Sequence, residues 1–299
     1  MQRQLTPEAY RRFTVASLVA LVLVIVAGAA VRLSNSGLGC DDWPNCNETS
    51  FVDVSSKHAA IEQVNRLFNG IVTVAVLLVA ALSHRVRPRR RGVVGLAWTL
   101  VALVAANAVL GGISVRVDLH PLAIQGHLLL ALAALVINVV LIARCSDPPT
   151  VSAGATAWTV RLAWLVAAGT LATIVAGTVV TGAGPHAGDE TAPRLDLDIP
   201  SVARVHGLLV LSTIAVALVL AARLPSRAVD RQAMGEAMTA WLLVGALQAA
   251  IGYVQYFNDL PELLVGAHVA GAALLTVATT NLVLHASPRL GDGSGVRHS

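Results

Sequence analysis

The apolar residues of this chain gather into long runs that short polar segments separate. Each run reaches the roughly 20 residues that an α-helix needs to cross a bilayer. In lipid, a segment of this length satisfies its backbone hydrogen bonds only as a helix, so we predict an all-α polytopic membrane protein. The eight predicted transmembrane helices cover about residues 13–33, 62–83, 93–112, 122–143, 157–181, 201–222, 236–256 and 262–285.

Composition agrees with this pattern. The chain has 299 residues, of which 56% are hydrophobic and only 13% are charged, whereas soluble domains carry about 25% charged residues. The first apolar run is too long for the hydrophobic region of a signal peptide, so we expect it to be retained as a transmembrane helix.

Arginines lie before the first run and in alternate loops, and the remaining loops are acidic. Cytoplasmic loops carry an excess of Lys and Arg, so we expect a plasma-membrane protein with both termini in the cytoplasm. We interpret the arginine run 85–91 as an anchor for this orientation and expect no nucleic-acid partner. The arginines are Arg3, Arg11, Arg12, Arg85, Arg87, Arg89, Arg90, Arg91, Arg144, Arg223, Arg227, Arg231, Arg289 and Arg297, and the acidic residues are Asp41, Asp42, Glu48, Asp53, Asp189, Glu190, Asp196 and Asp198.

The three cysteines divide between the two sides of the membrane. Cys40 and Cys46 lie in the first predicted outer loop, GLGCDDWPNCNETS, and Cys145 lies on the inner side. The oxidising outer side permits a disulfide between the first two. Their spacing, with no second pair nearby, does not suit a zinc site. The pair is either a structural staple or a redox-active dithiol.

The chain contains an internal repeat. The segment 26–37 resembles 175–186, and NAVLGGISVRVDLHPLAIQGH (107–127) resembles QAAIGYVQYFNDLPELLVGAH (248–268). Two four-helix units, residues 1–150 and 151–299, would therefore have the same orientation, related by an axis along the membrane normal. The Pro- and Ser-containing segment 145–157 is typical of a linker between them.

The second pair of segments shares one offset. His127 matches His268 and Asn107 matches Gln248, because 268 − 127 and 248 − 107 both equal 141. The same offset takes His206 to Asn65, since 206 − 141 equals 65.

Three histidines, His127, His206 and His268, fall inside predicted spans, five or six residues from the outer end. Polar side chains within a membrane are costly and indicate function. His206 and His268 lie at equal depth on two helices of one unit, as the two axial ligands of a six-coordinate haem require. Packed core histidines or a proton relay are the alternatives. Arg66 and Arg204, near the outer ends, could pair with haem propionates or anchor their helices at the interface.

Several motifs together resemble the haem A synthase family. They are GTVVTGAGPHAGD (177–189), ARVHG (203–207), the Gln, Tyr, Pro and His arrangement of the last two predicted helices, and the cysteine pair followed by IEQVNR (61–66). The resemblance covers essentially the whole chain. It implies oxidation of the C8 methyl of haem O to a formyl group, by two successive hydroxylations and loss of water, to give haem A for cytochrome oxidase.

The resemblance also implies site residues and partners. His206 and His268 would hold a haem b cofactor in the C-terminal bundle, and the N-terminal bundle would bind haem O through the positions Glu62, Asn65, Arg66 and His127. Arg66 and Arg116 would hold propionates, and Glu62 would accept a proton or stabilise a cationic intermediate. Expected partners are a haem O synthase, an electron acceptor and an external thiol-disulfide protein that acts on Cys40 and Cys46. Association of the chain into a homo-oligomer is a further alternative.

One residue departs from the family pattern. Asn65 stands where the family has a histidine, and an amide does not replace imidazole as a strong iron ligand. We favour an iron held by His127 alone, with an open face beside Glu62. The alternatives are that His58 substitutes for the missing ligand, or that this half is degenerate. Glu62 could also be a first-turn residue favoured by the helix dipole.

Two other classes of protein compete with this interpretation. A membrane di-haem cytochrome b-type electron carrier would need two complete histidine pairs, and Asn65 argues against that. A transporter would place polar residues near the bilayer midplane, whereas here they crowd the outer third.

Overall fold

The computed structural model describes residues 4–146, 155–287 and 290 of the chain. Within these residues it has 8 helices that are long and apolar enough to cross a membrane, which confirms the prediction of an all-α polytopic membrane protein. The predicted boundary at residues 150 and 151 lies outside the described residues, as do Arg3, Arg289 and Arg297. The helices are α1 (Pro7–Leu33), α2 (Lys57–Ser83), α3 (Val93–Arg116), α4 (Pro121–Arg144), α5 (Ala157–Ala183), α6 (Ile199–Arg223) with the short turn η1 (Leu224–Ser226), α7 (Ala228–Phe257) and α8 (Glu262–Ala286).

Helices α1 and α2 begin earlier than the apolar runs predicted. A capped polar turn precedes each run: Thr6 Oγ1 accepts the backbone N–H of Ala9, and Ser56 Oγ accepts that of Ala59. Such caps satisfy backbone donors that a helix start leaves free, so the helix extends beyond its hydrophobic part. The early start of α2 puts Glu62 beyond its first turn, which holds no acidic residue. The helix-dipole explanation of Glu62 is therefore wrong.

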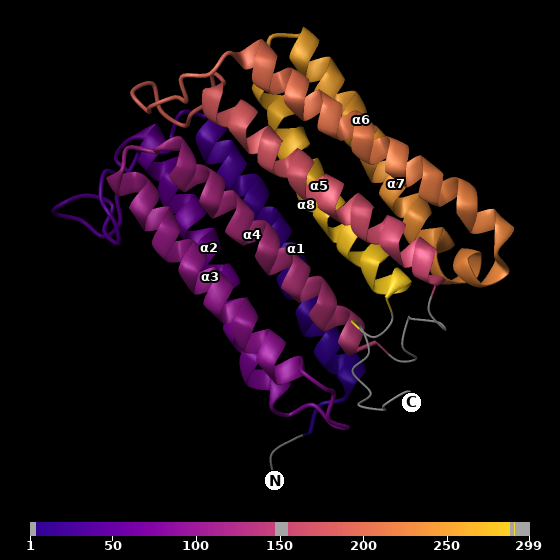
Figure 1. Ribbon diagram of the computed structural model, residues 1–299. Helices are drawn as coiled ribbons and strands as arrows, with labels where there is room; N and C mark the ends of the chain where they lie inside the picture. Colours follow the sequence, from indigo (N-terminus) through magenta and orange to yellow (C-terminus); the bar gives the residue numbers. More distant parts are fainter. Residues whose placement is uncertain (1–3, 147–154, 288–289, 291–299) are drawn as a thin grey trace.

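The helices form two groups that pack along a shared seam (Figure 1). Helices α1 to α4 pack in a ring, α1 against α2 and α4, and α3 against α2 and α4. In the other group, α5 packs against α6 and α8, and α7 packs against α8, whereas α6 and α7 touch only slightly. Helix α8 contacts α1 and α4, and α4 also contacts α5, so these four helices form the centre of the molecule.

Hydrogen bonds between side chains join helices within each group. Asn138 of α4 donates to Ser17 Oγ of α1 at 2.6 Å, and Trp241 Nε1 of α7 donates to Thr279 Oγ1 of α8 at 2.9 Å. Between helices in lipid, packing and such hydrogen bonds replace the hydrophobic driving force that water would supply. These bonds therefore fix which helix faces meet.

Four loops lie at one end of the molecule, which we call the disulfide end: residues 34–56, 117–120, 184–198 and 258–261. Loops of the two groups contact each other there. The backbone N–H of Gly37 donates to the carbonyl of Gly188 at 2.8 Å, and His186 Nε2 lies 2.8 Å from the carbonyl oxygen of Leu260. Helices α2, α4, α6 and α8 start from this end, and beyond their first turns they carry Glu62, Asn65, His127, His206 and His268.

Candidate functional site

The imidazoles of His206 and His268 face each other between α6 and α8. Their ring centroids are 6.4 Å apart, and the ring planes are inclined by 75°. His206 Nδ1 lies 3.0 Å from the carbonyl oxygen of Thr173 on α5. Because a carbonyl only accepts hydrogen bonds, Nδ1 carries the proton and leaves the Nε2 lone pair free to bind a metal.

A glycine makes room for each of these rings. A Cβ atom on Gly177 would lie 3.1 Å from Cε1 of His206, and one on Gly252 would lie 3.0 Å from Cε1 of His268. Any side chain at either glycine would push the imidazole aside. The two glycines thus determine where the two rings can lie.

This arrangement fits a haem iron. A bond between a metal and an imidazole nitrogen is about 2 Å long, so rings on opposite sides of one metal place their centroids about 6 Å apart. Among the described residues, no group of three or more His, Cys, Asp or Glu side chains could hold a bare metal ion. Two facing histidines instead suit a metal that brings its own equatorial ligands, as a porphyrin does.

In the first half, His127 repeats this packing on α4. A Cβ on Gly111 would lie 3.0 Å from Cε1 of His127, the distance found for Gly252 and His268. Unpaired buried atoms also recur. Asn107 Oδ1 has no partner among the described residues, and neither has the matching Gln248 Oε1. Unpaired polar atoms are costly in a protein interior, which is consistent with two sites shaped for a ligand.

The second side of the first-half site differs. Asn65 lies on α2, and its Oδ1 is buried without a partner. Gly28 lies 149 residues before Gly177, and a Cβ there would have no atom within 4 Å. His58 Nδ1 lies 2.9 Å from Ser36 Oγ, so this imidazole is engaged in the loop region rather than beside Asn65.

Glu62 is almost fully buried, with 5% of its surface exposed. Its Oε1 accepts hydrogen bonds from Arg66 Nε at 3.1 Å and Nη2 at 2.7 Å, and its Oε2 accepts the backbone N–H of Cys40 at 2.8 Å. The carboxylate charge is thereby paired, as a charge at this depth requires.

Cys40 and Cys46 form a disulfide, which closes residues 40–46 into what we call the Cys40–Cys46 ring. Arg116 Nη2 of α3 donates to the carbonyl of Trp43 in this ring at 2.7 Å. Trp43 packs on Gly112 of α3, where any Cβ atom would overlap the indole. The ring therefore bridges α2 and α3 next to Gly111, the residue that faces His127.

The remaining candidates are less enclosed. Arg204 is exposed on α6. It helps to lower the pKa of Asp198, although the hydrogen bonds from Ser201 at the start of α6 lower that pKa more. The structure thus brings together His206 with His268, and Glu62 with Arg66 and the ring, but leaves Arg204 at the surface.

The sequence did not reveal what Arg66 and Arg116 contact. Their partners include the carbonyl oxygens of Asp42, Trp43 and Asn45, and every residue type has a carbonyl. The glycines that pack against the histidines could have been found from the sequence. Gly111 and Gly252 are separated by the same 141 residues as His127 and His268.

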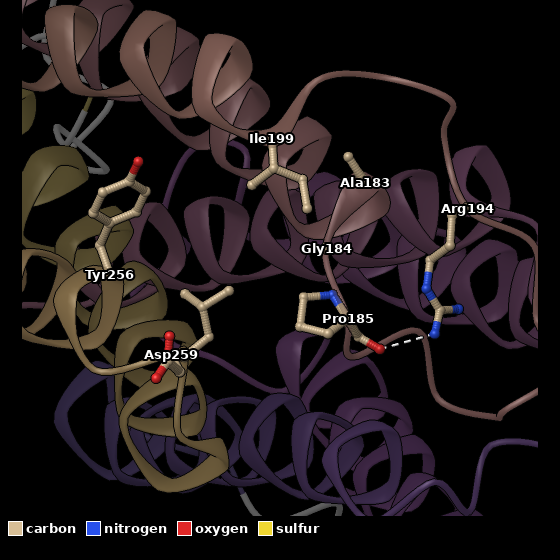
Figure 2. Close-up of a pocket in the computed structure, with 8 residues that line it drawn as sticks. Ala183, Gly184, Pro185, Arg194, Ile199, Tyr256 and Asp259 are labelled. Carbon is tan, nitrogen blue, oxygen red and sulfur yellow. Dashed lines mark hydrogen bonds between the residues drawn. The ribbon is translucent and has the colours of Figure 1, made fainter.

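A cavity of about 450 Å³ opens at the disulfide end of the second group (Figure 2). It is mainly apolar. Arg194 lies on one side and donates to the carbonyls of Pro185 and Ala192, each at 2.8 Å, while Tyr256 and Asp259 lie on the other side. None of the histidines discussed above lines this cavity, whose residues are Ala183, Gly184, Pro185, Arg194, Ile199, Tyr256, Asp259 and Leu260.

Comparison with curated proteins finds relatives over part of the chain. The proteins named Heme A synthase from Lysinibacillus sphaericus and Shewanella oneidensis are 31% and 30% identical, over 34% and 38% of this chain and the same shares of their own. The Heme A synthase of Geobacillus thermodenitrificans is 32% identical over 38% of this chain and 36% of its own. The matched segments span little more than a third of these relatives.

A family comparison covers far more of the chain. Residues 11–280, which include all eight helices except the ends of α1 and α8, match the family described as Cytochrome oxidase assembly protein. The chain belongs to the cytochrome oxidase assembly protein family.

Proposed function

We propose that this protein is a haem A synthase. It oxidises the C8 methyl of haem O to a formyl group by two successive hydroxylations and loss of water, and the product serves cytochrome oxidase. Membership of the assembly family and the partial matches to proteins named Heme A synthase support this proposal. The observation that carries it is the pair of imidazoles at 6.4 Å in one helix group, with a single corresponding histidine, His127, in the other.

The second helix group, in the proposed C-terminal bundle, is the cofactor site. His206 and His268 hold haem b there, and haem supplies one-electron redox chemistry when bound. Thr173 keeps the proton of His206 on Nδ1, and Gly177 and Gly252 set the ring positions. The chain's own contribution is thus to present two nitrogen ligands in a fixed orientation.

The first helix group is the substrate site. His127 binds the substrate haem O on one face, and Asn65 leaves the other face without a strong ligand. His58 is hydrogen-bonded to Ser36, which argues against its replacing the missing ligand. Glu62 is the catalytic residue. Its carboxylate accepts a proton released as the methyl is oxidised, or stabilises a cationic intermediate formed there.

The arrangement in the membrane follows from the charges. We propose that the disulfide end faces the outside of the plasma membrane and that both termini are cytoplasmic, because arginines fill the loops at the opposite end. Haem O synthase would supply the substrate. An electron acceptor must remove the electrons that oxidation of the methyl releases.

Expression beside a source of haem O, followed by pigment extraction, tests the function. We expect the purified protein to yield haem b together with haem A or its hydroxylated precursor. Recovery of two haem b molecules per chain without haem A would instead assign the protein to the di-haem electron carriers.

A further inference from the structure

We propose that Arg66 is a positioning residue that locks the Cys40–Cys46 ring onto α2 and thereby holds the Glu62 carboxylate in place. On this view Arg66 is not a propionate partner. The inference rests on the proposed function, because only that function makes Glu62 the catalytic residue. The contacts that carry it are independent of any haem.

The guanidinium of Arg66 is almost fully used. An arginine side chain has five N–H donors. The Nε donor and one Nη2 donor bind Oε1 of Glu62. The second Nη2 donor binds the carbonyl oxygen of Asp42 at 2.9 Å, and one Nη1 donor binds the carbonyl oxygen of Asn45 at 2.8 Å. A single Nη1 donor is left. Recognition of a carboxylate by arginine commonly uses two parallel donors, and Arg66 has no such pair to offer while the ring is docked.

The same contacts fix Glu62. Arg66 holds Oε1, and the ring itself holds Oε2 through the backbone N–H of Cys40. Because Arg66 also binds two carbonyls of that ring, the carboxylate, the arginine and the ring form one closed set of contacts. Removing Arg66 would release both the ring and one oxygen of Glu62.

The disulfide is shielded in this arrangement. Cys40 and Cys46 are each 1% exposed. Thiol-disulfide exchange requires a thiolate to reach one of the sulfur atoms. An external thiol protein therefore cannot react with the docked ring, which makes the disulfide a staple that keeps the carbonyls of Asp42 and Asn45 turned toward Arg66.

The ring also touches the other side of the proposed substrate site. Trp43 lies on Gly112, and Arg116 holds the Trp43 carbonyl, both on α3. Gly112 adjoins Gly111, against which His127 packs. A ring that stays docked thus spans the two helices, α2 and α3, that place Glu62 and support His127.

The rate of disulfide reduction tests the clamp without any haem O. Purified full-length protein in detergent is incubated with a phosphine reductant, and new thiols are labelled after denaturation and counted by mass. For Arg66→Gln we expect reduction at least about tenfold faster than in the wild type, because charge-assisted hydrogen bonds to the ring are lost. Reduction of Arg66→Gln at the wild-type rate would overturn the proposal.

The chain offers a matched control. Arg12 pairs with Glu8 at the same i,i+4 spacing and 3.2 Å, but both side chains are exposed. Arg12→Gln should be reduced at the wild-type rate. Buried Cys145 reports folding, since it should resist labelling before denaturation in every variant. If Arg66→Gln does not fold, Arg116→Gln removes the hydrogen bond to the Trp43 carbonyl and the 3.5 Å ion pair with Asp42. It should still accelerate reduction, and an unchanged rate there would also count against the clamp.

Titration with haem O separates positioning from propionate binding. Arg66→Gln should lower kcat with little change in KM, and Arg66→Lys should restore part of kcat. A raised KM with unchanged kcat would make Arg66 a propionate partner and overturn the proposal. Absence of haem A from the wild-type reaction would overturn the proposed function and the positioning role with it, whereas the reduction rates judge the clamp by themselves.

Discussion

His206 lies directly against Gly177. A Cβ atom on this glycine would come 3.1 Å from Cε1 of the imidazole, and His206 Nδ1 lies 3.0 Å from the carbonyl oxygen of Thr173, one turn away on α5. The position of the His206 imidazole is thus set by its close contact with Gly177 and by its hydrogen bond to Thr173. Both constraints come from a helix other than its own.

Gly177→Ala should therefore disturb the histidine pair. The added methyl pushes the imidazole away from Thr173, because 3.1 Å is too close for carbon atoms that prefer about 3.5–4.0 Å. We expect a weaker or broadened low-spin bis-histidine signal in the optical and EPR spectra of the purified protein. The matched control is Gly235→Ala, where a Cβ meets no atom within 4 Å. Identical spectra for the two variants would contradict the steric role of Gly177.

Hydropathy alone predicted all eight helices, because in lipid the length of an apolar run decides whether it can span. It missed the start of α2 at Lys57, where a Ser56 cap rather than an apolar residue begins the helix. The repeat likewise singled out His206 and His268, whose ring centroids lie 6.4 Å apart in the structure.

Contacts to the backbone were beyond the reach of the sequence. From the sequence we predicted that Arg66 and Arg116 bind haem propionates, because arginine commonly pairs with carboxylates. In the structure they bind carbonyl oxygens of the Cys40–Cys46 ring. Which carbonyls turn inward depends on the conformation of a loop closed by a disulfide, and residue types do not record it.

If Asn65 occupies a ligand position of the proposed substrate site, Asn65→His should supply a second histidine ligand there. We expect the variant loaded with haem O to gain a second low-spin bis-histidine signal, with loss of the high-spin signal of a haem held by His127 alone. Conversion to haem A should fall, since the open face is then occupied. A wild-type protein that already shows two low-spin haems, or a variant that stays high-spin, would contradict the assignment of Asn65.

Asp230→Ala should lower stability without touching either site. The buried Asp230 carboxylate accepts hydrogen bonds from the Thr156 backbone at 2.9 Å and from Thr159 Oγ1 at 2.8 Å, tying the start of α5 to α7. Hydrogen bonds to a charged group contribute about 1.5–3 kcal/mol each, so we expect a loss of about 2 kcal/mol or more. Thermal unfolding in detergent measures this. Glu236→Ala, at an exposed acidic position on the same helix, should unfold like the wild type.

The thiol of Cys145 should be inert until the protein unfolds. Burial raises its pKa to about 12, so the reactive thiolate is scarce at pH 8. Maleimide labelling at that pH should need denaturant. Because the folded state keeps the proton more strongly, this thiol's contribution to stability is full below its ordinary pKa of 9.0 and is lost as pH rises toward about 12. Cys145→Ser should accordingly lose less stability over that interval, and an equal loss would contradict the buried thiol.

Glu62→Ala should separate binding of the cofactor from the reaction. His206 and His268 lie in the other helix group, so the variant should keep its haem b spectrum. Without the carboxylate, haem O or its hydroxylated form should accumulate, which extraction and chromatography of the pigments would reveal. Glu62→Gln sharpens the comparison, because it keeps an oxygen to accept the Cys40 N–H but loses the charge. If Glu62→Gln fails as Glu62→Ala does while its ring stays closed to reductant, the charge is what the reaction needs. Normal haem A from Glu62→Ala would exclude a catalytic role for this residue.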